Sequence, residues 1–195
     1  SIARRVEHRP GVSLAATLLF AFSPFVVFLS GSYMNHVPVM TCLLIAMYAL
    51  VRQTEDEDPH VGWAALCGLM LGIPASMRPM DAIAFAVPAG LWMLWRTVQK
   101  PSRLPELLAA GVTIAIPLAA LLWYNTQLTG HPTTFPFELL WGKSHGLGFH
   151  ESPWGAPHTP ARGLELINIY FLRLQTNLFE IPGPSLLVPI SAMLL

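Results

Sequence analysis

Arg78 is the strongest candidate for a functional residue in this sequence, because it lies between two long apolar segments. An ionised side chain in such a place is costly and is by default a hypothesis of a functional site. Its planar guanidinium makes forked contacts that match the oxygens of a phosphate. The alternative is an ion pair with Asp81, three residues further on, at a membrane surface. The sequence supports both interpretations equally.

Two further polar pairs adjoin apolar segments. Asn35 and His36 lie in a short polar break between two such segments, and Tyr124 and Asn125 lie near the end of a later one. Polar groups of this kind could line a binding cavity. The alternatives are structural, because Asn supports turns and tyrosine is common at membrane interfaces.

Five of the seven histidines fall in segments that we expect on one side of the molecule. Clustered imidazoles can bind a metal, and a nearby carboxylate such as Glu138 could act as a general base. No HExxH or HxH spacing is present, however, and carboxylates are sparse near these histidines. We therefore favour solvated loop histidines and assign no metal ligand. The five are His36, His131, His145, His150 and His158.

The composition indicates that membrane helices position these residues. Charged residues make up 11% of the chain, hydrophobic residues 53%, and the mean hydropathy is +0.52. An ordinary soluble protein has about 25% charged residues. The formal net charge is zero, which argues against nucleic-acid binding. No Asp, Glu, Lys or Arg occurs between Arg9 and Arg52 or between Glu106 and Glu138.

The apolar segments predict an all-α fold, a polytopic bundle of about five to six transmembrane helices. We expect five of them within residues 1–128, with a kink at Pro24 in the first and a helix end at Gly130 after the last. Gly68 and Gly72 of the third have the spacing that lets two helices approach closely. The five predicted spans are residues 11–30, 37–51, 61–77, 82–95 and 105–128.

The Lys and Arg residues of short loops predict the orientation of the bundle. If the spans alternate in direction, most of these Lys and Arg residues fall on one side of the membrane, and that side should be cytoplasmic. Three segments then face outward together: residues 30–36, 78–81 and 129–160. The first two should therefore lie close in space.

The C-terminal third looks less like a membrane bundle. Residues 129–160 are rich in Gly, Pro, His and aromatic residues, and we expect an external loop. Residues 161–181 alternate polar and apolar faces at helical spacing, which favours a helix in the interface plane. The alternative, a spanning helix, would bury Arg173. A further transmembrane helix should begin within residues 185–195.

Several short motifs resemble bacterial glycosyltransferases of the GT-C class, in particular those related to protein O-mannosyltransferases and lipid A aminoarabinose transferases. The resemblance covers most of the chain. It rests on FSPF followed by SGSYMNH, on SMRPMDA, on YNTQLTGHP and on HTPARG, which begin at Phe22, Ser30, Ser76, Tyr124 and His158.

The resemblance implies transfer of a sugar from a polyprenyl-phosphate carrier to a glycan, lipid or protein acceptor, on the outer face of the bacterial inner membrane. The acidic catalytic residue of such enzymes lies in an early external loop, and we expect it upstream of this sequence, which we interpret as an internal fragment. The resemblance implies that Arg78 binds the donor phosphate. Asn35, His36, Asp81, Tyr124 and Asn125 would line the cavity, and Glu138, His145, His150 and His158 would belong to the acceptor loop.

Two other functions stay open at this point. A lipid or solute transporter or flippase would also place an arginine near a lipid phosphate, but it should show an internal repeat, and none is visible. A noncatalytic membrane scaffold would not need a long aromatic loop. No cofactor is indicated with certainty, and a divalent metal is left open.

Overall fold

The computed structural model describes residues 9–32, 34–55, 58–152, 154–177, 184–185 and 187. The described residues form helices and connecting turns, and they contain no strand, which confirms the predicted all-α fold. The helices are α2 (Pro10–Ala21), α3 (Pro24–Ser30), α4 (His36–Glu55), α5 (Val61–Gly72), α6 (Pro79–Gln99), α7 (Leu104–Thr129), α8 (Pro136–Trp141) and α9 (Pro160–Asn177). Three short 3-10 helices join them: η1 (Ile73–Ser76), η2 (Pro101–Arg103) and η3 (Lys143–His145).

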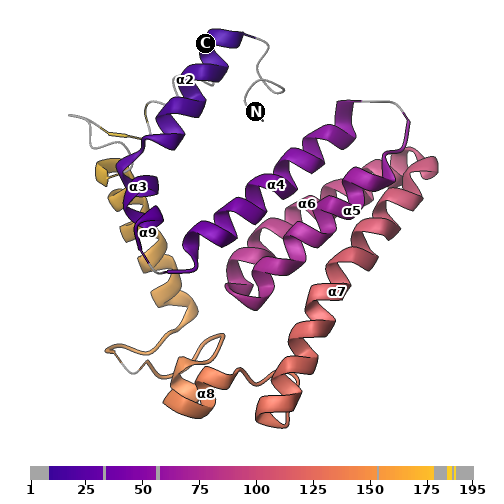
Figure 1. The fold of residues 1–195 in the computed structure, drawn as a ribbon. Helices are drawn as coiled ribbons and strands as arrows, with labels where there is room; N and C mark the ends of the chain where they lie inside the picture. The colour runs from indigo at the N-terminus through magenta and orange to yellow at the C-terminus, as the bar shows by residue number, and fades with distance from the viewer. Residues whose placement is uncertain are drawn as a thin grey trace. The chain divides into compact units, whose positions relative to one another are not determined.

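The chain groups into two compact units. The first comprises Ser1–Thr17 and Ser32–Tyr124, and the second comprises Leu18–Gly31 and Asn125–Leu195. Helices α4, α5 and α6 and most of α7 make up the bundle of the first unit, and Figure 1 shows them running alongside one another. Four of the five predicted spans thus correspond to helices of one bundle.

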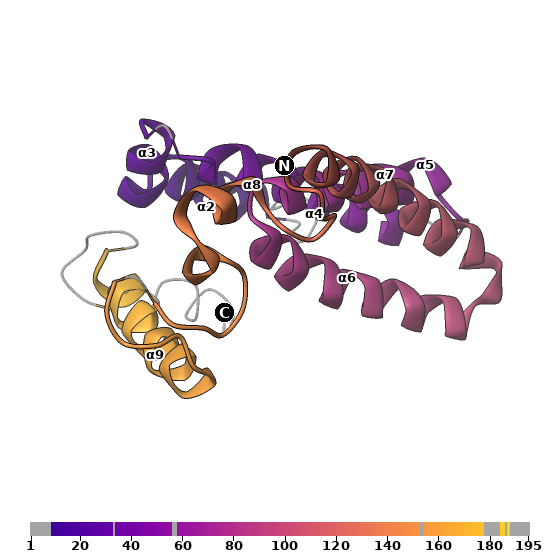
Figure 2. The ribbon, with the colours of Figure 1, turned by 90° about the horizontal axis from the view of Figure 1, so that it is seen from below.

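The core of this bundle follows from helical spacing on α4. Val39, Leu43 and Ala46 recur every three or four residues, which places them on one face of the helix. They pack with Cys67 and Leu71 of α5 in a buried cluster. Figure 2, turned by 90°, shows α6 on one side of the layer that contains α4, α5 and α7.

Two glycines bring α5 against α7. A methyl group on Gly68 would collide with the carbonyl of Ala110, and one on Gly72 would lie 2.8 Å from the carbonyl oxygen of Ile114. The Thr113 hydroxyl of α7 donates to the Ala65 carbonyl of α5 at 2.8 Å. This close approach is the role that the spacing of the two glycines predicted.

The first predicted span, residues 11–30, is two helices rather than one kinked helix. Proline cannot donate a hydrogen bond, and it disfavours the helical conformation of the residue before it. Ser23 accordingly has φ −57° and ψ 128°, and α3 begins at Pro24. The chain therefore breaks between α2 and α3.

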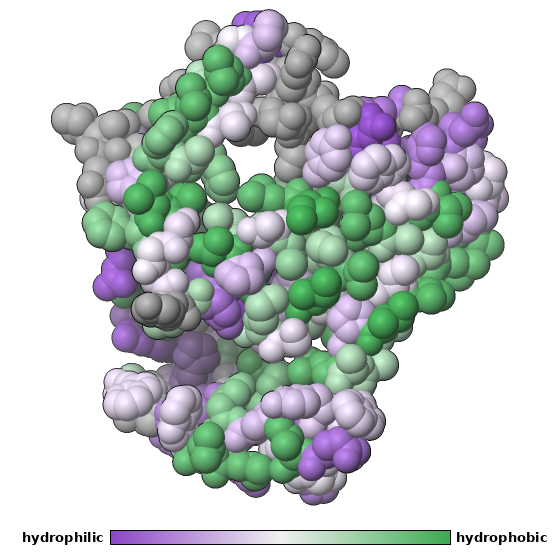
Figure 3. All heavy atoms as spheres, viewed as in Figure 1, coloured by the Kyte–Doolittle hydropathy of each residue, from purple (hydrophilic) through white to green (hydrophobic). Residues whose placement is uncertain are grey.

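Apolar side chains cover much of the surface of the helices, as the green residues in Figure 3 show. Val112, Ile116 and Trp123 of α7 are all exposed. Two helices of the described chain are long and apolar enough to cross a membrane, His36–Glu55 and Pro101–Thr129. Shorter apolar helices are Pro10–Ala21 and Val61–Ser76. The number of spans, about five to six, stays a prediction.

The second unit contains the segment expected as a long loop. Gly130 has φ 77° and its N–H donates to the Thr126 carbonyl at 3.0 Å, so it ends α7 as predicted. Residues 129–160 are less irregular than expected, because α8 and η3 form within them. Helix α9 matches the predicted amphipathic helix up to Asn177, but its placement in the interface plane remains a prediction. The predicted helix at 185–195 lies outside the described residues, except for residues 185 and 187.

Candidate functional site

The sequence Arg78-Pro79 begins α6. Pro79 stands in the first turn of the helix, where its missing N–H costs nothing, and Arg78 is the residue before the helix, with φ −144° and ψ 79°. Asp81 lies in the same first turn, where the helix dipole favours a negative charge. The N–H of Arg78 donates to the carbonyl of Pro74 at 2.7 Å and joins η1 to α6. Local sequence therefore fixes the arginine at a helix start.

The guanidinium of Arg78 bridges two helices. Its Nε donates to a carboxylate oxygen of Asp81, so the ion pair that was one interpretation of the sequence is present. Its Nη1 lies 2.6 Å from Nδ1 of His36, the first residue of α4. A guanidinium can only donate hydrogen bonds, so the His36 ring is the acceptor in this contact.

Asn35 reinforces this junction. Its side-chain amide donates to the Met77 carbonyl at 2.9 Å, across 42 positions of the sequence. Asn35 and His36, at the start of α4, thus contact Met77 and Arg78, which immediately precede α6. The prediction that the segments around His36 and Arg78 lie close in space is confirmed.

This junction has the chemistry of an anion site. The Arg78 side chain keeps 34% of its surface exposed although it contacts both Asp81 and His36. A ligand can therefore reach part of the fork, and the start of α6 adds its positive dipole end. The His36 ring and the Asn35 amide supply further polar groups at the same place.

Tyr124 and Asn125 differ from each other in their surroundings. Tyr124 is exposed on α7. Asn125 is 1% exposed, and its amide donates to the Pro132 carbonyl at 3.0 Å. The Asn125 carbonyl accepts from the Thr129 hydroxyl at 2.8 Å. These contacts fold the chain back after α7, which is the structural role that the sequence left open for Asn125.

Glu138 and His150, two of the candidates in the acceptor loop, line one cavity of about 410 Å³ in the second unit. The backbone N–H of Phe135 donates to the Glu138 carboxylate at 3.4 Å. The His158 ring stacks on that of Phe149 at 6.1 Å and lies 6.4 Å from that of His150. The cavity combines aromatic, aliphatic, acidic and basic side chains: Phe135, Glu138, Leu139, Lys143, Phe149 and His150.

The histidines of this segment organise its backbone. Nδ1 of His145 lies 2.9 Å from the Trp141 carbonyl, and the ring of His145 contacts those of Trp141 and Trp154 at 5.7 and 6.1 Å. His150 reaches two carbonyls, those of Glu151 and Gly146, each at 2.7 Å. These two hydrogen bonds, that to Glu151 first, raise the pKa of His150 above its ordinary value. Within the described chain, no three His, Cys, Asp or Glu side chains group to hold a metal ion.

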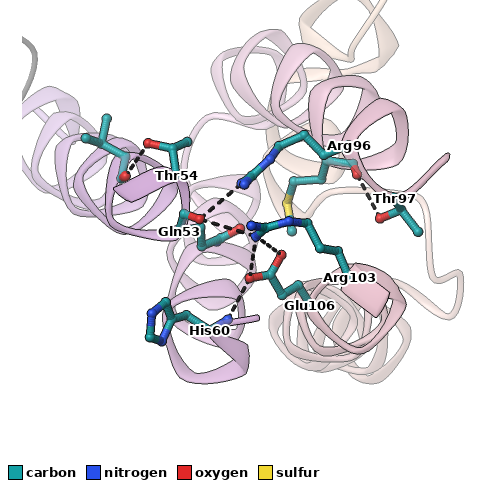
Figure 4. Close-up of polar contacts among 9 residues, drawn as sticks. Gln53, Thr54, His60, Arg96, Thr97, Arg103 and Glu106 are labelled. Atoms are coloured by element: carbon teal, nitrogen blue, oxygen red, sulfur yellow. Dashed lines mark hydrogen bonds and ion pairs between the residues drawn. The ribbon is translucent and has the colours of Figure 1, made fainter. Parts of the chain in front are cut away.

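A polar network at the other end of the bundle was not expected from the sequence. Arg103 and Glu106 are 5% and 3% exposed and pair at 3.3 Å. Figure 4 shows both near the end of α4, where Arg103 and Arg96 donate to the Gln53 carbonyl at 3.5 and 3.1 Å. The Glu106 carboxylate also accepts the backbone N–H of His60 at 2.7 Å.

This network joins the ends of α4 and α6 to the starts of α5 and α7. Breaking a buried ion pair by removing one partner typically costs about 3–5 kcal/mol, so the contact is important for the bundle. Arg96 and Arg103 are among the Lys and Arg residues of short loops that predict the orientation of the bundle. The available signal was the spacing of Arg103 and Glu106, three residues apart at the start of a helix.

The family model for dolichyl-phosphate-mannose-protein mannosyltransferases matches residues 1–124. This range contains the Arg78 junction and the whole bundle of α4 to α6. Searches of curated proteins and of solved structures found no match.

Proposed function

The chain belongs to the dolichyl-phosphate-mannose-protein mannosyltransferase family, and from this membership we propose that it passes a sugar from a polyprenyl-phosphate carrier to an acceptor on the outer face of the bacterial inner membrane. The family, together with the apolar helices, makes it an integral membrane glycosyltransferase of the GT-C kind that uses a lipid-linked sugar donor. The identity of the carrier, the face of the membrane and the acceptor class are parts of the proposal.

The observation that carries the proposal is the junction of Arg78 with His36 and Asp81 at the start of α6. In the transfer, the bond between the sugar C1 and the phosphate oxygen breaks, and a bond from C1 to the acceptor oxygen forms. The acceptor hydroxyl gives up its proton to a general base, such as a carboxylate, and the carrier leaves as polyprenyl phosphate. Negative charge grows on that phosphate, and a guanidinium at a helix N-terminus stabilises it.

The other candidates take supporting roles in this proposal. Asn35 and His36 hold Arg78 in place and, with Asp81, surround the donor phosphate. Tyr124, which is exposed on α7, would line the donor cavity, whereas Asn125 would stabilise the chain after α7 through its hydrogen bond to Pro132. In the second unit, the cavity beside Glu138 and His150 would receive the acceptor, with His145 and His158 supporting its backbone and rings.

The test compares Arg78→Lys and Arg78→Ala with the wild type in the full-length protein, reconstituted in liposomes with a polyprenyl-phosphate sugar donor. Lysine keeps the charge but loses the fork, and alanine loses both. Transfer should fall in the order wild type, Lys, Ala, with a loss for Ala of about 2–5 kcal/mol in transition-state stabilisation if the pair is desolvated.

Arg52→Ala is a matched control, because Arg52 also pairs with a carboxylate three residues on, that of Glu55 at 2.8 Å, and is similarly exposed. Its transfer rate should match the wild type. Insertion and helicity of all variants are measured in the same liposomes. Normal turnover and donor affinity in a correctly inserted Arg78→Ala protein would remove Arg78 from the site and leave it a structural role through its contacts with Asp81 and His36.

A further inference from the structure

An apolar groove lies between α4, α5 and α6 in the first unit. It encloses about 350 Å³, and its lining is almost entirely hydrocarbon and aromatic: Met47, Leu50, Leu71, Phe85, Pro88 and Trp92 are among its residues. Met47 and Phe85 are themselves exposed, so the groove opens on the surface of the bundle. Along α6 it extends from Ala84 to Trp92, which is about 12 Å by the helical rise.

One end of the groove is basic. The guanidinium of Arg96 lies over the ring of Trp92, 4.8 Å from its centroid. Trp92 belongs to the groove lining, so the apolar wall passes directly into a positive charge. Tryptophan next to arginine is the arrangement found where a membrane helix reaches the headgroup region.

The charges around Arg96 favour an added anion. Among the described residues, the charged neighbours of Arg96 are Arg103 and Glu106, and these two pair with each other at 3.3 Å. Arg96 instead donates to the neutral carbonyl of Gln53. An anionic headgroup at this point would therefore add a charge pair without displacing one.

We propose that this groove binds one anionic phospholipid, with an acyl chain along Trp92 and Phe85 and the phosphate on Arg96. Arg78 immediately precedes α6 and Arg96 lies in its last turn, so the two arginines are about 27 Å apart along the helix. That distance is close to the thickness of the hydrocarbon layer, about 30 Å. The lipid site and the proposed donor site therefore lie in opposite leaflets. The bound lipid lies in the leaflet on the side of the basic loops.

The experiment uses the full-length protein in phosphatidylcholine vesicles that contain phosphatidylglycerol with a photoreactive group midway along one acyl chain. After illumination, mass spectrometry locates the captured residues. Capture should map to the groove residues of α4 and α6 and exceed that of a matched phosphatidylcholine probe. Arg96→Gln should lower it by about fivefold, the effect of one basic residue near an anionic surface. Capture equal to that of phosphatidylcholine would overturn the proposal.

Arg52→Gln is the matched control, because Arg52 also stacks on a tryptophan, Trp63, at 5.1 Å, but Trp63 does not line this groove. It should leave capture in the groove unchanged. Ala84→Phe narrows the groove from an exposed position without touching Arg96, and it should also reduce capture. A loss of capture with Arg52→Gln as large as that with Arg96→Gln would contradict a specific lipid site in this groove. Undiminished capture in Ala84→Phe would contradict it as well.

Two further measurements in the same assay test whether the lipid bound in the groove differs from the sugar donor. Arg78→Ala should leave capture unchanged, which separates this site from the proposed donor site. Polyprenyl phosphate added in excess should not displace the probe, and displacement would assign the groove to the sugar carrier instead.

Discussion

His150 contacts two backbone carbonyls through its two ring nitrogens, and only the protonated ring can donate to both. The pKa of His150 in the folded chain is accordingly raised above its ordinary value of 6.5, first by the Glu151 carbonyl and then by that of Gly146. A group whose pKa is raised by folding stabilises the folded form below the unfolded pKa. That contribution is lost as the pH rises through the folded pKa.

The segment around His150 should therefore be more ordered in mild acid. Amide hydrogen exchange in residues 142–158, corrected for the intrinsic effect of pH, should be slower at about pH 5.5 than at about pH 8. His150→Gln should abolish most of this difference. His131→Gln should retain it, because His131 contacts Thr129 through its backbone. Equal pH dependence in the wild type and His150→Gln would refute the assignment.

Single residues were predictable from sequence where their position alone carried the signal. Arg78 stood out because it interrupts apolar sequence, and alternation of the helices predicted its proximity to His36. The pairing of Glu106 with the His60 N–H gave no such signal, because it joins residues 46 positions apart through one carboxylate. Contacts of this kind depend on how helix ends meet, which the hydrophobic pattern does not specify.

The contact between α5 and α7 depends on glycine at two positions, and Gly68 is the more crowded. Gly68→Ala places a methyl group against backbone atoms of α7 that cannot move without shifting the helix. We expect a loss of about 1–3 kcal/mol in the free energy of unfolding, as for other overpacked sites. The measurement is unfolding of the full-length protein in mixed micelles, followed by helicity.

Gly111→Ala is the control for this prediction, since a methyl group on Gly111 of α7 meets nothing within 4 Å. Alanine is the better helix former, so this variant should be at least as stable as the wild type. Equal destabilisation by both substitutions would show that backbone propensity, rather than the approach of two helices, decides the effect.

The helices of the bundle were predictable because each is an apolar run between charged or proline-containing breaks. The ends agree within about one residue for α5 with η1 and for α7. Helix α4 continues past its predicted end to Glu55, and α6 extends beyond both predicted ends to include Arg96 and the first-turn Asp81. The error at the first span came from treating Pro24 as a kink. Ser23 adopts an extended conformation, and one apolar run therefore becomes two helices.

On the scale of the whole molecule, the uneven Lys and Arg distribution predicts that Thr54 and Ser152 face opposite sides of the membrane. Thr54 lies in the last turn of α4, and Ser152 in the segment after η3. Cysteines placed singly at these two positions, in a full-length chain with Cys42 and Cys67 replaced by alanine, should react with an impermeant thiol reagent from opposite sides of sealed vesicles.

The parent chain without cysteines provides the background, and permeabilised vesicles show that both positions are reactive. Labelling of both cysteines from the same side would overturn the orientation. It would also place the proposed donor site and the acceptor segment in different compartments, which transfer between them cannot accommodate.

The hydrogen bond from His60 to Glu106 also bears on how the protein is made. A polypeptide emerges from the ribosome starting with its N-terminus. Residue 60 is therefore synthesised well before Arg103 and Glu106, and the first hairpin of the bundle, α4 with α5, waits for the partners of Gln53 and His60. Arg96 of α6 is the first donor to the Gln53 carbonyl, and translation of η2 and the first turn of α7 then supplies Arg103 and Glu106. The basic end of the bundle is thus completed late in synthesis, when its last helix begins.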